Sequence, residues 1–153
     1  METVKQIKTV LTLLFAFVSS ALGILAVPVY VLVACNIVDY VTGLMASKYR
    51  KEDINSYKSI KGIKKKISMW LLVFVGALID QVVLYASEVA GVSLPFTFLI
   101  SCIVALWIIC NEIISILENI QDIGVTIPPF LQPLVKHIRS QVEEQLKGED
   151  PHE

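Results

Sequence analysis

Three carboxylates lie inside long apolar stretches of this 153-residue chain: Asp39, Asp80 and Glu112. A charged side chain near the centre of a membrane-spanning helix costs about 2.5–3.5 kcal/mol on insertion scales, so such groups are protonated, paired, buried against protein or hydrated. Intramembrane carboxylates also mark ion and substrate paths. Two interpretations stay open: the carboxylates join helices through hydrogen bonds, or they line a path that opens when several copies assemble.

Polar and small residues accompany each carboxylate at helical spacing, which places them on shared faces. Asn36 and Gly43 share a face with Asp39, and Gly76 shares one with Asp80. A longer polar stripe follows Glu112 toward the end of the last apolar stretch. The predicted pore-lining or helix-packing positions are Asn36, Asp39, Thr42, Gly43, Asp80, Asn111, Glu112, Ser115 and Glu118.

The elements that carry these residues are predicted to be membrane-spanning helices. Hydrophobic residues make up 55% of the chain, and no Lys or Arg occurs between Lys8 and Lys48. That run would form a helix of about 57 Å, nearly twice the ~30 Å hydrocarbon core, so it must fold back, and Gly23 and Pro28 mark the break. We expect an all-α integral membrane protein with four transmembrane helices in two hairpins, near residues 9–26, 29–47, 67–85 and 95–118.

A basic segment, residues 48–66, separates the two predicted hairpins. It holds eight of the thirteen Lys and Arg residues: Lys48, Arg50, Lys51, Lys58, Lys61, Lys64, Lys65 and Lys66. Because basic flanks stay cytoplasmic, this loop and both termini are predicted to face the cytoplasm. Apolar residues recur every three or four positions from Tyr57 to Trp70, which predicts a helix along the membrane surface with its lysines toward anionic headgroups. Nucleic-acid binding, the other use of such a cluster, is disfavoured.

Residues 1–124 are predicted to form the membrane domain and residues 125–153 a cytoplasmic tail. Leu134, Ile138, Val142 and Leu146 recur at four-residue spacing and predict an amphipathic helix that lies on the membrane or pairs with copies of itself. A cleaved signal peptide is the alternative for the N-terminus, but no polar mature segment follows it. The three cysteines have no metal-like spacing and are read as packing residues. No cofactor site and no catalytic constellation is predicted.

Several of these residues resemble the motifs of a known family. Residues 39–43 (DYVTG), a basic loop with residues 61–66 (KGIKKK), Asp80, and residues 111–119 (NEIISILEN) with Gly124 and Pro128 are similar to the toxin-secretion and phage-lysis holin family. The similarity covers about residues 29–135. Pro129 doubles a proline that is usually single, and Cys110 precedes the Asn-Glu pair, which are slight departures.

The resemblance implies a small protein that accumulates in the bacterial cytoplasmic membrane, oligomerises and makes lesions. The cargo would be a cell-wall hydrolase or a large toxin, and the partners would be the lipid bilayer and further copies of the chain. Two alternatives remain from the residues themselves. A proton-coupled transporter would use Glu112 or Asp39, and a holin antagonist or membrane anchor would bind its partner through the basic loop and tail.

Overall fold

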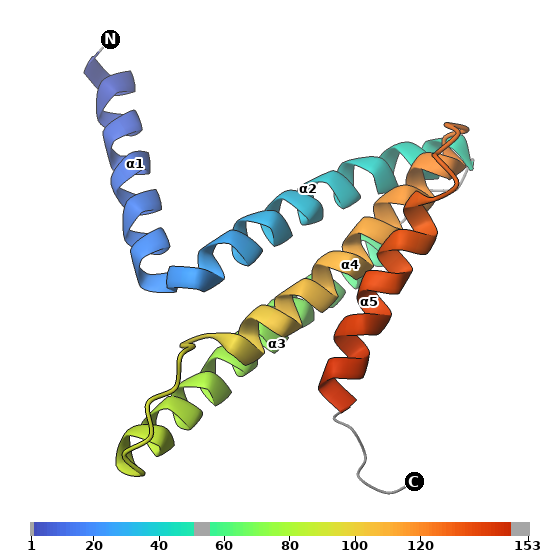
Figure 1. Ribbon diagram of the computed structural model, residues 1–153. Coiled ribbons are helices and arrows are strands. Elements are labelled where there is room, and N and C mark those ends of the chain that lie inside the picture. The colour runs from blue at the N-terminus through green and yellow to red at the C-terminus, as the bar shows by residue number, and fades with distance from the viewer. Residues whose placement is uncertain (1, 51–55, 148–153) are drawn as a thin grey trace, which may run out of the picture.

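The computed structural model describes residues 2–50 and 56–147, and this part of the chain is helical, without a strand. A short 3₁₀ turn, η1 (Gly23–Leu25), separates the first two helices. The helices are α1 (Glu2–Leu22), α2 (Ala26–Tyr49), α3 (Ser56–Val89), α4 (Leu99–Asp122) and α5 (Leu131–Lys147) (Figure 1). The predicted all-α class is confirmed for the described residues.

Three stretches of the described chain are long and apolar enough to cross a membrane: Glu2–Tyr49, Gly62–Val89 and Leu99–Asp122. The first stretch, 48 residues long, contains both spans that were predicted before the basic segment. The second stretch contains the predicted third span, and the third stretch overlaps the predicted fourth span from residue 99 to residue 118. Three candidate membrane-spanning stretches therefore stand where four spans were expected, and the arrangement as two hairpins stays a prediction.

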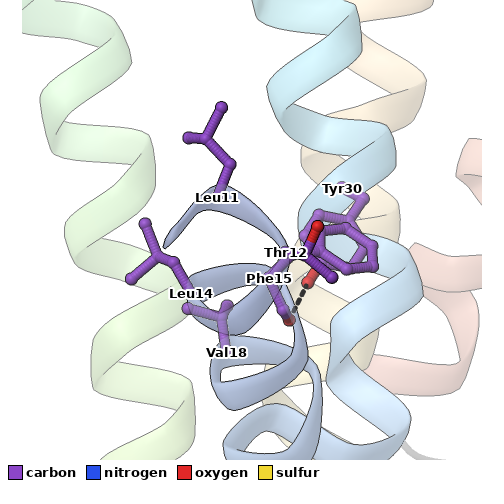
Figure 2. Close-up of a pocket in the computed structure, with 6 residues that line it drawn as sticks. All are labelled: Leu11, Thr12, Leu14, Phe15, Val18 and Tyr30. Carbon is purple, nitrogen blue, oxygen red and sulfur yellow. Dashed lines mark hydrogen bonds between the residues drawn. The ribbon is translucent and has the colours of Figure 1, made fainter. Parts of the chain in front are cut away.

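The bend inside the first stretch lies at Gly23, as predicted. Gly23 has a φ of +51°, a conformation that favours glycine because it has no side chain. Across the bend, the Tyr30 ring stacks on Phe15 at 4.7 Å between centroids (Figure 2). The Tyr30 hydroxyl also lies 2.7 Å from the Ser19 Oγ. Pro28 lies in the first turn of α2, where proline is tolerated, and not in the break. Beyond this junction α1 leans away from the other helices and buries none of its residues (Figure 1).

The predicted surface helix and third span are one continuous helix, α3, of 34 residues. The helix assignment therefore runs without interruption from the basic segment into the third span, and the expectation that the basic part lies along the membrane surface stays a prediction. The sequence of residues 56–89 contains no proline to interrupt a helix. Lys66 also finds partners on α2 and α4, which holds the start of α3 against its neighbours.

Helix α4 is the centre of the molecule, since it packs against α2, α3 and α5 (Figure 1). Leu32 of α2 and Ala105 and Ile108 of α4 are completely buried between these helices. Helix α4 begins at Leu99 and ends at Asp122, four residues later at each end than the predicted span at 95–118. The start is set by Asp80 of α3, which accepts hydrogen bonds from the first amides of α4.

The predicted amphipathic helix of the tail is present as α5. It runs back along α4, and Val135 packs in a small core with Cys110 and Leu117 of α4. Two of its predicted apolar positions, Leu134 and Ile138, stay 48% and 45% exposed. The sequence left open whether this helix lies on lipid or on another copy, and in the structure it packs against its own chain.

Candidate functional site

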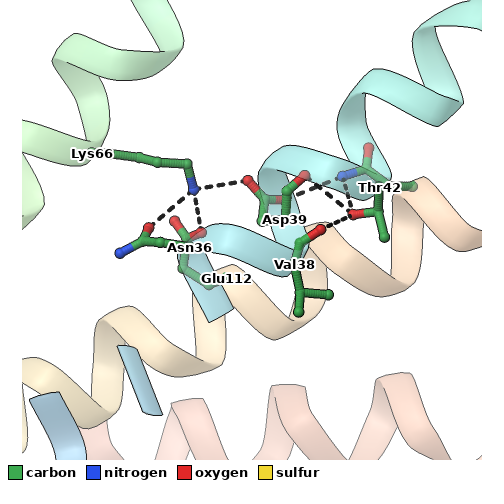
Figure 3. Close-up of polar contacts among 7 residues, drawn as sticks. Asn36, Val38, Asp39, Thr42, Lys66 and Glu112 are labelled. Carbon is green, nitrogen blue, oxygen red and sulfur yellow. Dashed lines mark hydrogen bonds and ion pairs between the residues drawn. The ribbon is translucent and has the colours of Figure 1, made fainter. Parts of the chain in front are cut away.

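A polar cluster, which we call the Lys66 cluster, joins α2, α3 and α4. Its members are Lys66, Asn36, Asp39 and Glu112 (Figure 3). The Lys66 Nζ donates to the Asn36 Oδ1 at 3.1 Å and to the Asp39 Oδ2 at 2.9 Å, and it also forms an ion pair with Glu112. An ammonium has three hydrogens to donate, and here each has an acceptor on a neighbouring helix.

The Lys66 cluster is largely shielded from the surroundings of the chain. The exposed fractions of its charged side chains are 6% for Glu112, 15% for Asp39 and 23% for Lys66. A charge in such a position is tolerated when an opposite charge and further hydrogen bonds compensate for the lost hydration. One ammonium therefore compensates two carboxylates from two different helices, and the cluster retains one excess negative charge in its fully ionised form.

One further residue, Asn119, holds the Asp39 carboxylate in place. The Asn119 Nδ2 on α4 donates to the Asp39 Oδ1 at 3.2 Å and to the Thr42 Oγ1 at 3.4 Å. A Cβ added to Gly43 would lie 3.6 Å from that same nitrogen, which is ordinary contact. Asn119 was not among the predicted site residues. It lies seven residues after Glu112, on the same helix face, and this spacing is the signal that could have identified it.

Asp80 serves a different purpose from the carboxylates of the Lys66 cluster. It is 6% exposed and accepts hydrogen bonds from the backbone N–H groups of Ile100 at 2.9 Å and Ser101 at 2.8 Å, and from the Ser101 Oγ at 2.7 Å. The first amides of a helix have no partner within the helix, and its N-terminus carries partial positive charge. Asp80 thus caps α4 from the neighbouring helix, a role usually performed by the residue that precedes the helix.

The remaining predicted polar positions are not gathered at one place. Asn111 and Ser115 are half-buried on α4, whereas Glu118 is exposed. Lys48, Lys64 and Lys65 are exposed, and Arg50 forms an ion pair with Asp122. Lys51 lies outside the described residues, and the side chains of Lys58 and Lys61 lie outside the description as well. Lys66 differs from the headgroup role predicted for it, because its ammonium points inward to the carboxylates.

Contacts between α4 and α5 form a second polar group that the sequence did not indicate. The Trp107 Nε1 donates to the Glu143 Oε1 at 2.8 Å, and the Arg139 Nε donates to the same oxygen at 2.8 Å. The Arg139 guanidinium lies 5.5 Å from the centre of a Trp107 ring, a cation–π arrangement. Arg139 and Glu143 are four residues apart, a helical pair visible in the sequence, but nothing in the sequence indicates that Trp107 is their partner.

Metal ligation has no support in the described part of the chain, where no group of three or more His, Cys, Asp or Glu side chains could hold an ion. Cys35, Cys102 and Cys110 are all free thiols, half-buried or buried among apolar side chains. They pack in the core, as expected.

Comparison with known proteins identifies the family. Residues 16–140 match the model of the bacteriophage holin family, a range that contains the whole Lys66 cluster, Asp80 and most of α5. An uncharacterized protein of Listeria monocytogenes is 36% identical over 107 residues, which cover 70% of this chain and 68% of the relative. An uncharacterized protein of Halalkalibacterium halodurans is 29% identical over 126 residues, 82% of this chain and 88% of the relative.

A further similar protein, from Clostridium perfringens, is 28% identical over 113 residues, 74% of this chain and 76% of its own length. No solved structure matches. The family match confirms the resemblance that the motifs predicted, and it extends over more of the chain than they did. This chain belongs to the bacteriophage holin family.

Proposed function

We propose that this protein is a phage- or prophage-type holin that oligomerises in the bacterial cytoplasmic membrane and makes lesions through which a cell-wall hydrolase or a large toxin leaves the cell. The observation that carries the proposal is the family match over residues 16–140, which spans α2 to α4 and the Lys66 cluster between them. The three candidate membrane-spanning stretches support the location in a membrane.

The internal pairing of the carboxylates supports a resting state that is harmless to the membrane. Within one chain Lys66 compensates the charges of Asp39 and Glu112, and the Asp80 carboxylate accepts hydrogen bonds from the first turn of α4. Such a chain can accumulate in lipid without opening a hydrated path. A movement of α3 away from α2 and α4 would release both carboxylates of the cluster at once, and on assembly they would face water shared by several copies. The membrane potential acts on each such charge with about 2.3 kcal/mol per 100 mV, so its collapse can trigger the change.

The orientation follows from the distribution of basic residues. With the segment between α2 and α3 in the cytoplasm and an even number of crossings, both termini and all thirteen Lys and Arg residues lie on the cytoplasmic side. This arrangement requires α1 to cross the membrane as a fourth span.

The release of molecules of different sizes from vesicles tests the proposal. Purified protein is reconstituted into vesicles loaded with small ions and with fluorescent dextrans of increasing size. A holin releases the large dextrans. A proton-coupled transporter, which the buried Asp39–Lys66–Glu112 arrangement would also suit, releases none of them and carries only a small solute. In cells, abrupt growth arrest on expression supports the holin, and delayed lysis in the presence of a second holin would identify an antagonist instead.

The role of the carboxylates in opening has its own test. Asp39→Asn together with Glu112→Gln removes the charges that we expect to face the lesion, so the time of lysis and the size limit for dextrans should both change. Glu118→Gln is the matched control, because Glu118 lies exposed on the same helix as Glu112 and makes no part of the cluster. If the double variant changes neither the time of lysis nor the size limit, the carboxylates do not face the lesion and serve only to pack the helices together.

A further inference from the structure

Helix α5 meets α4 with only part of its apolar face. Five apolar residues of α5 lie within an arc of about 100° when 3.6 residues make one turn: Leu131, Leu134, Val135, Ile138 and Val142. Val135 is buried against α4, whereas Leu134 and Ile138, toward the other edge of the arc, are 48% and 45% exposed. The polar flank of α5 completes the contact through Arg139 and Glu143. The apolar face of α5 is therefore larger than its contact with α4 and is turned partly away from it.

The contact at Trp107 lies deep along a stretch that is long and apolar enough to cross a membrane. A hydrocarbon core of ~30 Å covers about 20 of the 24 residues of Leu99–Asp122, at ~1.5 Å per residue. Wherever those residues begin within the stretch, Trp107 lies about 16–22 Å from the edge at which α4 leads into α5. Arg139 and Glu143, which contact Trp107, would then lie near the middle of the core.

In this docked position α5 would bring charged side chains into contact with lipid chains. Lys136 and Glu144 are exposed, and the side chains of Arg139 and Glu143 are 38% and 39% exposed. Charged side chains that face the hydrocarbon of a bilayer are strongly disfavoured. Docking of α5 and contact of lipid with this side of α4 therefore exclude one another.

The surface of α4 beneath α5 is itself suited to lipid. Cys110, Ile114 and Leu117 form its core, and all three are apolar. The ion pair between Arg139 and Glu143 lies within α5, so it can leave together with that helix. Residues 123–130, which join the two helices, are not helical, so α5 can turn away without unfolding the end of α4.

We infer that α5 leaves α4 when α4 spans the bilayer, and that α5 then lies along the membrane surface next to the end of α4. The partner of its apolar face is a phospholipid bilayer, in which Leu134 and Ile138 are buried together with the residues that touch α4 in the docked position. An amphipathic helix in this place keeps its charges at the headgroups and in water. The inference rests on the proposed function in one respect, the crossing of a membrane by α4.

Depth-dependent quenching of two labels on α5 tests the inference. Leu134→Cys and Gln141→Cys each carry an environment-sensitive fluorophore, in a variant with the three native cysteines replaced by alanine. Both positions are exposed in the docked helix and lie on one side of it, about 10 Å apart. The vesicles contain zwitterionic and anionic phospholipid with a nitroxide either near the headgroup or near the end of an acyl chain.

For both labels we expect the shallow nitroxide to quench about twofold more strongly than the deep one, because a helix along the surface has both positions at one depth. In a docked α5, the label at Gln141 would lie about 10 Å deeper than the label at Leu134. Stronger quenching of the Gln141 label by the deep nitroxide would overturn the inference.

A disulfide between α4 and α5 gives a second measurement. Val135→Cys lies in the same small core as the native Cys110, and Cys35 and Cys102 are replaced by alanine. Mild oxidation is expected to join the two cysteines in detergent micelles, which have no fixed thickness and can leave α5 docked. In vesicles we expect at least about tenfold less of the disulfide. Equally high yields in micelles and vesicles would contradict the inference.

Trp107 separates a failure of this inference from a failure of the proposed function. In Trp70→Phe it is the single tryptophan, and we expect the deep nitroxide to quench it more strongly, since it lies near the middle of the core. Deep quenching of Trp107 beside unequal depths of the two α5 labels would refute the inference and leave the proposed function standing. Shallow quenching of Trp107 would refute the span of α4 on which both depend.

Discussion

Asp80 and the Lys66 cluster are two solutions to one problem, the burial of a carboxylate among apolar helices. Asp80 accepts hydrogen bonds from two backbone amides and one hydroxyl of α4, all of which belong to the consecutive residues Ile100 and Ser101. Asp39 and Glu112 depend instead on one shared cation, Lys66, from a third helix, and Asp39 accepts one further hydrogen bond, from the Asn119 side chain. Backbone donors cannot be withdrawn unless the helix itself unfolds, whereas an ammonium on a flexible stem can change partners.

The comparison separates a fixed part of the molecule from a part that can rearrange. The Asp80 end of the α3–α4 pair is fixed by the chain's own helix geometry, and Gly76 lets the two helices approach closely there. The Lys66 end joins three helices through side chains alone. We therefore expect substitutions at the two ends to reduce the free energy of unfolding by different amounts. We also expect that a second substitution can restore stability at one end and not at the other.

The largest effect is expected for Lys66→Met, which leaves two carboxylates without their partner. Removing one member of a buried pair costs about 3–5 kcal/mol, and we expect about 3 kcal/mol because Lys66 is 23% exposed. The measurement is the free energy of unfolding in mixed micelles, followed by circular dichroism. Lys65→Met is the matched control, since Lys65 is exposed on the same helix turn, and it should change stability by less than about 0.5 kcal/mol.

A double replacement sharpens this first prediction. In the Lys66→Met background, Asp39→Asn with Glu112→Gln removes the uncompensated charges, so much of the lost stability should return. No recovery would mean that Lys66 contributes through packing of its stem and not through its charge.

The next effect is expected for Asp80→Ala, at about 2 kcal/mol, because buried amides of Ile100 and Ser101 lose their acceptor. Asp80→Asn keeps a carbonyl oxygen that can still cap the helix, so it should lose about 1 kcal/mol. The same unfolding measurement compares the two. An equal loss for both substitutions would show that the charge, and not the geometry of the cap, supplies the stability.

Gly76→Ala tests the close approach beside the cap. A Cβ at Gly76 would lie 3.0 Å from the Ser101 Cα and 3.2 Å from its backbone nitrogen, so the start of α4 must shift away from α3. Overpacking outweighs the helix preference of alanine, and we expect a net loss of about 1 kcal/mol. Gly62→Ala is the control on the same helix, where no atom lies within 4 Å of the added Cβ, and it should leave stability unchanged or raise it by up to about 1 kcal/mol.

The smallest effect is expected for Trp107→Phe, which keeps an aromatic ring and removes the hydrogen bond to Glu143. We expect a loss of about 0.5–1 kcal/mol, confined to the docking of α5. Amide hydrogen exchange resolves it, with faster exchange in residues 131–147 and unchanged exchange in α2. Faster exchange in α2 as well would place α5 in the same cooperative unit as the Lys66 cluster.

Local patterns in the sequence were sufficient for the helices and for the family. Apolar runs, helical periodicity and the absence of basic residues from those runs predicted helical elements near their observed positions, with the bend at Gly23. These signals are local because helix hydrogen bonds join residues only four apart. The family followed from short motifs on α2 and α4, which are equally local.

Partners across helices could be decided only by the tertiary structure. The sequence placed Asp39, Asp80 and Glu112 in one class, whereas the structure assigns two of them to Lys66 and the third to the start of α4. Lys66 looked like its neighbours Lys64 and Lys65, and only the rotation of α3 against α2 and α4 turns its ammonium inward. The same holds for Trp107 and α5: composition shows that a residue is apolar or charged, but the register between helices, which depends on packing of all side chains together, determines what it meets.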